Sequence, residues 1–276
     1  VAPSRGLGDV YKEAYKLALG GCPLIKDDHS LFNQSYAPFK DRVKACVDSV
    51  NNANAKTGGR SLYIANCTAD SMEFLERAMT AQELGAGGIM AAPGLLGLSI
   101  IRELSSAPDF HLPIFLHPCF SGPLVLSADS GISPFCCYGQ FSRLAGADAA
   151  IFTSFGGRFP FTEEVCRKIC DGTETEMGGL RSIFPVPSGG MKWQLFKKMV
   201  QVYGPDAIFL VGGALLTESN DLTANMHFYF EKLNEAVNKS RKAALEDRYK
   251  DSATKCTVIN RKPPVKQQGF FISLFF

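Results

Sequence analysis

The sequence predicts an α/β protein folded as a (β/α)8 TIM barrel. Short apolar runs rich in small and β-branched residues alternate with amphipathic helical stretches, as expected of repeated βα units. The polar and glycine residues gather directly after the predicted strands, on the face where barrel enzymes build their sites. The chain has 276 residues, 46% apolar and 20% charged, a size that suits one large core. A doubly wound sheet is the alternative, but its glycine fingerprint after the first strand is missing.

Seven strands are expected from the apolar runs, and an eighth completes the barrel. The eighth is the first in the chain and is cut short at its beginning, where only residues 1–3 remain. The other predicted strands are residues 23–26, 61–66, 88–92, 113–117, 149–152, 183–187 and 207–211.

Helices are expected between the strands because apolar residues recur there with helical spacing. Asp9 can cap the first, which runs to Leu19 before Gly20 and Gly21, and Gly85 stops the third. The predicted helices are residues 9–19, 39–55, 71–84, 134–144, 162–169, 192–202 and 222–244.

Composition and charge argue against nucleic-acid-binding and membrane-spanning proteins. A net charge of +2 with scattered lysines and arginines offers no field for nucleic acid. No apolar run reaches the roughly 20 residues of a membrane span. Nine cysteines at irregular spacings indicate reduced thiols in an intracellular protein. We expect a cytoplasmic location, and an organelle stays open because Val1 indicates a fragment or a processed chain.

The segment from Lys26 to His29 places one ammonium, two carboxylates and one imidazole at the end of a predicted buried strand. Charged groups there must be solvated, paired or bound to a metal ion. Carboxylates suit Mg²⁺, and histidine can also ligate. The alternative is a polar loop in which Lys26 pairs with an aspartate.

Two glycine loops follow the last two predicted strands. Ser188, Gly189 and Gly190 follow one strand, and Gly212 and Gly213 follow the next. Backbone amides in such loops can approach an anion closely, and barrels commonly bind phosphate at these two positions. The pair of loops therefore predicts a phosphorylated small-molecule substrate, although each glycine pair alone is typical of a tight turn.

These motifs resemble the C-terminal barrel domain of the ribulose bisphosphate carboxylase large-chain family, and more closely its non-carboxylating branch, the RuBisCO-like proteins. The similarity spans about residues 1–244, and we divide the chain into a barrel domain at 1–250 and an irregular tail at 251–276. The family's N-terminal α+β domain, which the partner subunit of a homodimer contributes to the site, is absent here. The landmarks are the Lys26 to His29 segment, residues 66–69, His117-Pro118, residues 155–159 and the two glycine loops.

The resemblance implies that Lys26 reacts with CO₂ to form a carbamate, which joins Asp28 and the next residue in holding Mg²⁺. That residue is usually Glu in the family and is His29 here. His29 can be a ligand, a base or a solvated loop residue. His117 aligns with the family's catalytic histidine, so we expect an acid, a base or a substrate contact. Arg158 stands where the carboxylase has its mobile lysine, and we expect it to bind phosphate or carboxylate.

Other departures argue against carboxylation. Ala2 replaces a proton-transferring lysine, and Pro118 and Ser121 replace a basic residue and a second histidine. The sequence therefore predicts Mg²⁺-dependent enolisation, isomerisation or decarboxylation of a phosphorylated keto sugar or keto acid. The alternatives are a fragment of a true carboxylase and a non-catalytic barrel that binds phosphate or serves assembly.

Overall fold

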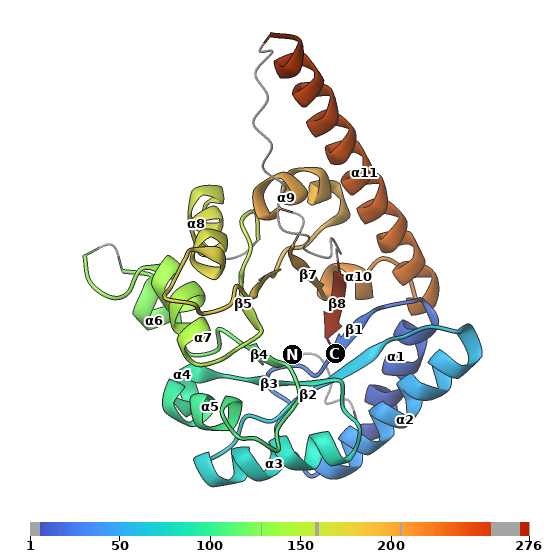
Figure 1. Ribbon diagram of the computed structural model, residues 1–276. Coiled ribbons are helices and arrows are strands. Elements are labelled where there is room, and N and C mark those ends of the chain that lie inside the picture. The colour runs from blue at the N-terminus through green and yellow to red at the C-terminus, as the bar shows by residue number, and fades with distance from the viewer. Residues whose placement is uncertain (1–5, 128, 158–159, 205, 255–270, 276) are drawn as a thin grey trace.

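A closed barrel of parallel strands forms the centre of the protein. The computed structural model describes residues 6–127, 129–157, 160–204, 206–254 and 271–275. In this part of the chain each strand pairs with the next in sequence, and the last returns to the first (Figure 1). The strands are β1 (Leu24–Lys26), β2 (Leu62–Asn66), β3 (Gly88–Ala91), β4 (Ile114–Leu116), β5 (Ala149–Thr153), β6 (Phe184–Ser188), β7 (Ile208–Val211) and β8 (Phe271–Phe275).

The (β/α)8 class is confirmed, and β1 to β7 lie where the apolar runs predict them. The strand that closes the barrel is not the predicted one. Residues 1–3, the expected eighth strand, lie outside the described residues. Instead β8, from the segment expected to be an irregular tail, pairs in parallel with both neighbours, and Lys26 of β1 stands in register with Phe275. The edges of β1 and β7 need hydrogen-bond partners, and a run of aromatic and aliphatic residues can supply them.

The helices surround the barrel. They are α1 (Leu7–Leu19), α2 (Phe39–Thr57), α3 (Ser71–Glu83), α4 (Pro93–Leu96), α5 (Leu98–Ser105), α6 (Gly122–Val125), the π-helix η1 (Phe135–Gln140), α7 (Phe141–Leu144), α8 (Glu163–Glu174), the 3₁₀ turn η2 (Trp193–Leu195), α9 (Phe196–Tyr203), α10 (Gly213–Leu216) and α11 (Leu222–Thr254). The short helices α4, α5, α6 and α10 are not among the predicted ones.

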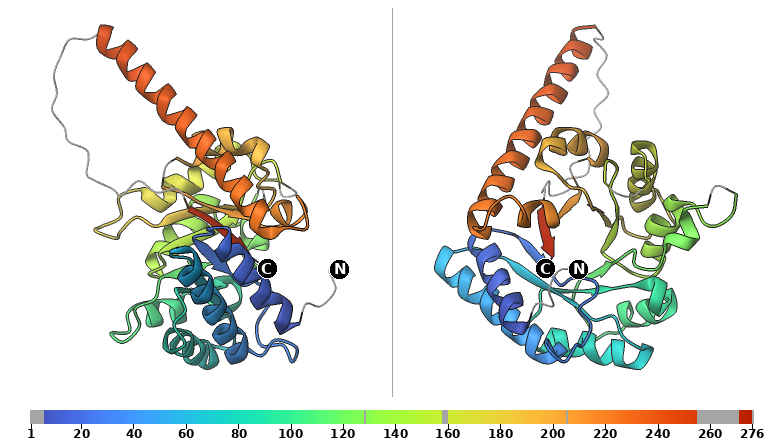
Figure 2. Two further views of the ribbon diagram at one scale, coloured as in Figure 1. Left: turned by 90° about the vertical axis from the view of Figure 1, so that its right-hand side faces the viewer. Right: turned by 180° about the vertical axis from the view of Figure 1, so that it is seen from behind.

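Three helices begin or end at residues other than the predicted ones. Gly6 caps α1, and Asp9 lies inside the first turn, where its charge complements the helix dipole. Gly58 ends α2 in the left-handed conformation, with φ 71°, as is common after a helix. The helix α11 continues to Thr254 and extends beyond the barrel (Figure 2). Among the described residues, no helix combines the length and the hydropathy that a lipid bilayer crossing needs.

Strand alternation places the core and the site. Side chains inside the barrel form one cluster, and those on the other face of each strand pack against the helices, as the two-residue period of a strand requires. In β1, Leu24 packs against the interior cluster and Ile25 belongs to the helix layer. Lys26 therefore faces the interior at the carboxyl end of the barrel, and Asp27 faces the helices. The interior cluster contains Ile64, Met90, Phe115, Ala149, Ile151, Val186, Ile208 and Leu210.

Candidate active site

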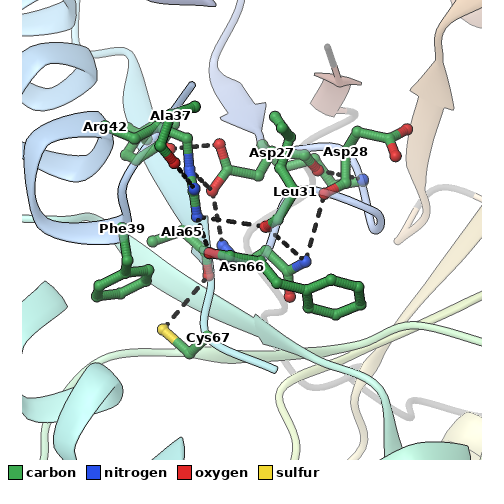
Figure 3. A network of polar contacts seen from close by, with 12 residues as sticks. Asp27, Asp28, Leu31, Ala37, Phe39, Arg42, Ala65, Asn66 and Cys67 are labelled. Atoms are coloured by element: carbon green, nitrogen blue, oxygen red, sulfur yellow. Dashed lines mark hydrogen bonds and ion pairs between the residues drawn. The ribbon is translucent and has the colours of Figure 1, made fainter. Parts of the chain in front are cut away.

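Asp27 anchors the loop after β1 to the helix layer. Its carboxylate is fully buried and accepts hydrogen bonds from Arg42 Nε at 3.1 Å, from the backbone N–H of Asn66 at 2.9 Å and from the Tyr63 hydroxyl. Arg42 comes from α2, and Tyr63 and Asn66 come from β2. Figure 3 shows the Asp27 side chain beside Arg42 and Asn66. Asp27 is therefore a structural ion-pair partner rather than a residue of the site cavity.

Arg42 and Asn66 hold the rest of this loop. The Arg42 guanidinium, also fully buried, donates to the carbonyls of Leu31, Phe32 and Ala37 at 3.1–3.3 Å. The Asn66 amide donates to the carbonyls of Asp28, His29 and Leu31 at 3.1–3.3 Å (Figure 3). Burial acts to lower the pKa of Arg42, but Asp27 and Tyr63 outweigh it and raise that pKa. The loop that carries Asp28 and His29 is thus fixed by permanent charge and by amide donors.

Lys26 is a buried amine at the end of β1. Its side chain is 1% exposed, and Nζ donates to the Asp27 carbonyl at 2.7 Å. Burial lowers its pKa to about 8, although Asp28 and Asp27 act in the opposite direction. A larger share of neutral amine is therefore present near neutral pH than in a solvated lysine. Only the neutral amine can react as a nucleophile.

Asp28 and His29 lie in the loop after β1. One Asp28 oxygen accepts from the backbone N–H and the hydroxyl of Ser30, at 2.8 and 2.6 Å. His29 Nδ1 lies 3.5 Å from the same oxygen. The His29 ring stacks on that of His117, with centroids 4.6 Å apart and an angle of 8° between the planes. The structure therefore brings two predicted site residues from different strands into direct contact.

His117 is held as a neutral imidazole. Burial, with Lys26 and His29 nearby, lowers its pKa to about 2. Its Nδ1 accepts the backbone N–H of Cys119 at 3.1 Å, so the ring proton of the neutral form is assigned to Nε2. His117 is consequently a poor proton acceptor in this environment and a suitable hydrogen-bond donor.

One cavity of about 710 Å³ collects residues from several separate segments of the chain. Its walls include His29 after β1, His117 after β4, the glycine loop after β6 and the glycine loop after β7. The predicted site residues that line it are His29, His117, Ser188, Gly189, Gly190, Gly212 and Gly213. Lys26 and Asp28 are not in its lining, and Arg158 lies outside the described residues.

The glycines after β6 are required by backbone contacts. Gly189 and Gly190 both have positive φ, at 76° and 74°, a conformation that glycine adopts readily. A Cβ on Gly190 would stand 2.5 Å from the Cα of Gly157. The loop after β5 is therefore packed directly against the predicted phosphate loop. Gly213 differs, since a Cβ there would meet nothing within 4 Å.

Sequence reasoning did not single out two parts of this site. Lys192 lines the cavity and is the one lysine or arginine among its described lining residues. The position of Lys192, two residues after Gly190, is the sequence feature that could have identified it. The second part is the network of Arg42 and Tyr63 around Asp27, for which the alternation of strand side chains was the available signal.

The side chains at this site fit a metal ion only if Lys26 carries a carbamate. Among the described residues, no group of three or more His, Cys, Asp or Glu side chains could hold a metal. Asp28 and His29 supply one carboxylate and one imidazole, and Lys26 is close enough for Asp28 to act on its pKa. A carbamate on Lys26 would add an oxygen ligand and remove the ammonium charge, which is the donor chemistry that Mg²⁺ prefers.

Comparison with known proteins shows the family of this chain. Residues 4–226 match the family model of the ribulose bisphosphate carboxylase large chain, catalytic domain. The chain belongs to this family. Its relatives include RuBisCO-like proteins and enolases of the non-carboxylating branch, so the resemblance inferred from the motifs is confirmed.

Several relatives have named activities. The chain is 36% identical over 214 residues to a 5-methylthioribulose-1-phosphate isomerase from Rhodospirillum rubrum, covering 76% of this chain and 54% of the relative. It is 35% identical over 211 residues to a 2,3-diketo-5-methylthiopentyl-1-phosphate enolase from Geobacillus thermodenitrificans, covering 76% and 51%. This RuBisCO-family chain therefore spans about half the length of the curated relatives it matches.

Solved structures show the same fold. A RuBisCO-like protein (MtnW) from Alicyclobacillus acidocaldarius is 30% identical and superimposes with a TM-score of 0.79, over 87% of this chain and 60% of that one. An octameric ribulose-1,5-bisphosphate carboxylase/oxygenase from Pyrococcus horikoshii gives a TM-score of 0.81 over 93% and 62%, at 21% identity. At 21% identity, the similarity to the carboxylase/oxygenase shows a shared fold and no more.

Proposed function

We propose that this RuBisCO-like chain takes part in the Mg²⁺-dependent enolisation of a phosphorylated keto sugar or keto acid, with isomerisation or decarboxylation as the outcome. One observation carries the proposal. A single cavity gathers a stacked imidazole pair, two glycine loops and a lysine from loops that are far apart in the sequence.

Lys26, Asp28 and His29 form the metal-binding part of the proposed site. The neutral amine of Lys26 attacks CO₂, an N–C bond forms, and the nitrogen loses a proton to solvent to give a carbamate. Carbamate oxygen, Asp28 and His29 would hold Mg²⁺, which when bound supplies polarisation of a substrate carbonyl. The loop bearing Asp28 and His29 is already fixed by Asn66 and Arg42, so little ordering is required on binding.

His117 stabilises charge rather than accepting a proton. Its Nε2–H can donate to the oxygen that becomes negative as the enolate forms, and a preorganised donor of this kind is effective in a water-poor site. The low pKa of His117 keeps the imidazole neutral across the neutral range, and because Nδ1 accepts the Cys119 N–H, the proton of the neutral ring is on Nε2. A Lys26 carbamate is left as the base that takes the carbon-bound proton.

The phosphate end lies at the two glycine loops. Gly189, Gly190, Gly212 and Gly213 line the cavity, and without a Cβ at these positions an anion can approach the backbone closely. Lys192 adds a positive charge at the same wall. The substrates named for the relatives, both 1-phosphates of keto compounds, are the first compounds to test.

Proton exchange tests the enolisation directly. 5-Methylthioribulose 1-phosphate and 2,3-diketo-5-methylthiopentyl 1-phosphate are incubated with the chain in D₂O containing Mg²⁺ and bicarbonate, and loss of the proton next to the carbonyl is followed by NMR. Lys26→Ala should slow exchange roughly hundredfold or more. Lys44→Ala, at an exposed lysine of α2, should leave it unchanged. No exchange by the wild-type chain, or equal exchange without CO₂, contradicts the proposal.

A further inference from the structure

The helix α11 carries the chain away from the barrel before β8 closes it. The first part of α11 packs on the barrel through one face, whose buried apolar residues are Leu222, Met226, Tyr229, Leu233, Ala236 and Val237. Beyond Val237 the helix continues to Thr254, which adds about 25 Å at the helical rise per residue. Figure 2 shows this part extending beyond the barrel. The next described element is β8, which lies in the barrel wall.

The connection between α11 and β8 is long enough to serve two barrels. Residues 255–270 can span at most roughly 55 Å when extended, which exceeds the length of the projecting part of α11. The strand can therefore return to its own barrel or reach a barrel beside it. A long connection gives a low effective concentration of β8 at its own slot. Closure within one chain consequently has only a modest entropic advantage over closure by a second copy.

The slot for β8 recognises a strand through its backbone. β8 has three register pairs with β1 and four with β7, whereas β7 has a single register pair with β6, between Ser188 and Leu210. The backbone N–H and C=O groups of β7 and β1 therefore depend on β8 for partners. The same strand from another copy would form the same ladders, which is the general condition for exchange of an identical element between protomers.

We propose that two copies of this chain associate by strand exchange, in which residues 271–275 of each copy occupy the slot between β7 and β1 of the other. The occupant is a second copy because the slot already accepts this segment in a parallel register. Leu274 is in register with Val211, directly before the glycine loop after β7, and Phe275 is in register with Lys26. Each copy would thus complete the wall of the other's candidate site. The inference follows from the fold and does not depend on the proposed function.

Photo-crosslinking between isotope-labelled chains tests the exchange. An unlabelled full chain with Phe271→p-benzoylphenylalanine is mixed with an equal amount of ¹⁵N-labelled wild-type chain, and both are unfolded in urea and refolded together. Phe271 is in register with Ile208, so irradiation should join β8 to a β7 peptide, which mass spectrometry identifies as light or heavy. Random pairing of exchanged copies should give the heavy peptide in about half of the products at high protein concentration. The heavy share should fall when the mixture is diluted before refolding.

Two control chains identify the contact that is crosslinked. Lys44→p-benzoylphenylalanine, at an exposed lysine of α2, should give no β7 product. Ile272→Pro, added to the chain with the crosslinker at residue 271, removes a backbone donor from the ladder and should abolish the light and heavy products together. Ile272→Val keeps the donor and should retain both products.

Each result decides for or against exchange. Light peptide alone at every concentration, or a heavy share no greater than in the Lys44 control, refutes it and leaves β8 as a strand of its own barrel. If the crosslinker at residue 271 gives no product, Phe275→p-benzoylphenylalanine is used in the same way, with β1 as the expected target because Phe275 is in register with Lys26. No product from either position overturns the proposal, since β8 then does not occupy the slot.

Discussion

At the scale of single residues, the burial of Lys26 makes the stability of the fold depend on pH. A lysine in the unfolded chain keeps its ordinary pKa of 10.5, whereas burial lowers the pKa of Lys26 to about 8 in the fold. The unfolded state therefore binds more protons between these two pKa values, and the free energy of unfolding rises with pH in that window. Below about pH 8 both states are protonated, and the full cost of burying the ammonium remains.

Lys26→Met should remove this pH dependence. The pKa shift corresponds to about 3 kcal/mol, so the variant should be more stable than the wild type near pH 7 by up to that amount. The difference should shrink as pH rises from 8 to 10.5. Urea denaturation at a series of pH values measures it. Lys44→Met, at an exposed lysine, should follow the wild-type profile, and a Lys26→Met profile parallel to it would show that Lys26 is not desolvated.

Gly213 gives the cleanest test of the phosphate end. Its conformation is not left-handed and the space around it is open, so Gly213→Val should place a side chain into the anion position at little cost to the fold. A sugar phosphate at about a hundredfold excess over Kd stabilises the native state by about 2.7 kcal/mol. Thermal melts with ribose 5-phosphate should show this gain in the wild type and a loss of it in the variant.

The control for that experiment is Gly8→Val. Gly8 also lies near the start of a helix, has open space around it and has no positive φ. It should keep the protection by sugar phosphate. Equal protection in Gly213→Val and Gly8→Val would remove this glycine loop from the phosphate site.

At the scale of elements, the contact of α2 with the loop after β1 depends on a buried ion pair. Arg42 and Asp27 are both fully buried, and removal of one partner from such a pair typically costs about 3–5 kcal/mol because the other charge is left uncompensated. We expect Arg42→Met to be destabilised by this amount in urea denaturation. Adding Asp27→Asn should recover part of the loss, since the remaining charge is then removed.

A surface pair on the same helix is the matched comparison. Lys44 and Asp48 form an exposed ion pair on α2, and its loss in Lys44→Met should cost less than about 1 kcal/mol. Similar costs for Arg42→Met and Lys44→Met would mean that the loop after β1 does not depend on Arg42.

At the scale of the whole molecule, β8 closes the barrel between β7 and β1 (Figure 1). A proline there removes a backbone donor from the ladder. If Ile272→Pro costs about 2 kcal/mol, the melting temperature should fall by roughly 4–8 °C. Ile272→Val keeps the N–H and is the control. Identical melting of the two variants would show that residues 271–275 do not close the barrel in solution.

Much of the barrel could be predicted because its signals are local. Short apolar runs that end at a polar residue, a glycine or a proline define β1 to β7 within a few positions, and the order of these runs defines the parallel barrel. The short helix α4 was missed because four residues show too little periodicity. The position of β8 was missed because strand pairing joins residues that are far apart, such as Lys26 and Phe275.

The candidate site, like the barrel, could be predicted from the sequence only in part. The sequence by itself determined which residues end up at the carboxyl face: Lys26, Asp28, His29 and His117 follow strands, and strand ends meet there whatever the details of packing. Only the tertiary structure decided that Asp27 turns to Arg42, that the rings of His29 and His117 stack and that the two glycine loops line one cavity with them. The physical reason is range, since periodicity and turn chemistry act between near neighbours, whereas ion pairing, ring contacts and cavities depend on how distant segments pack.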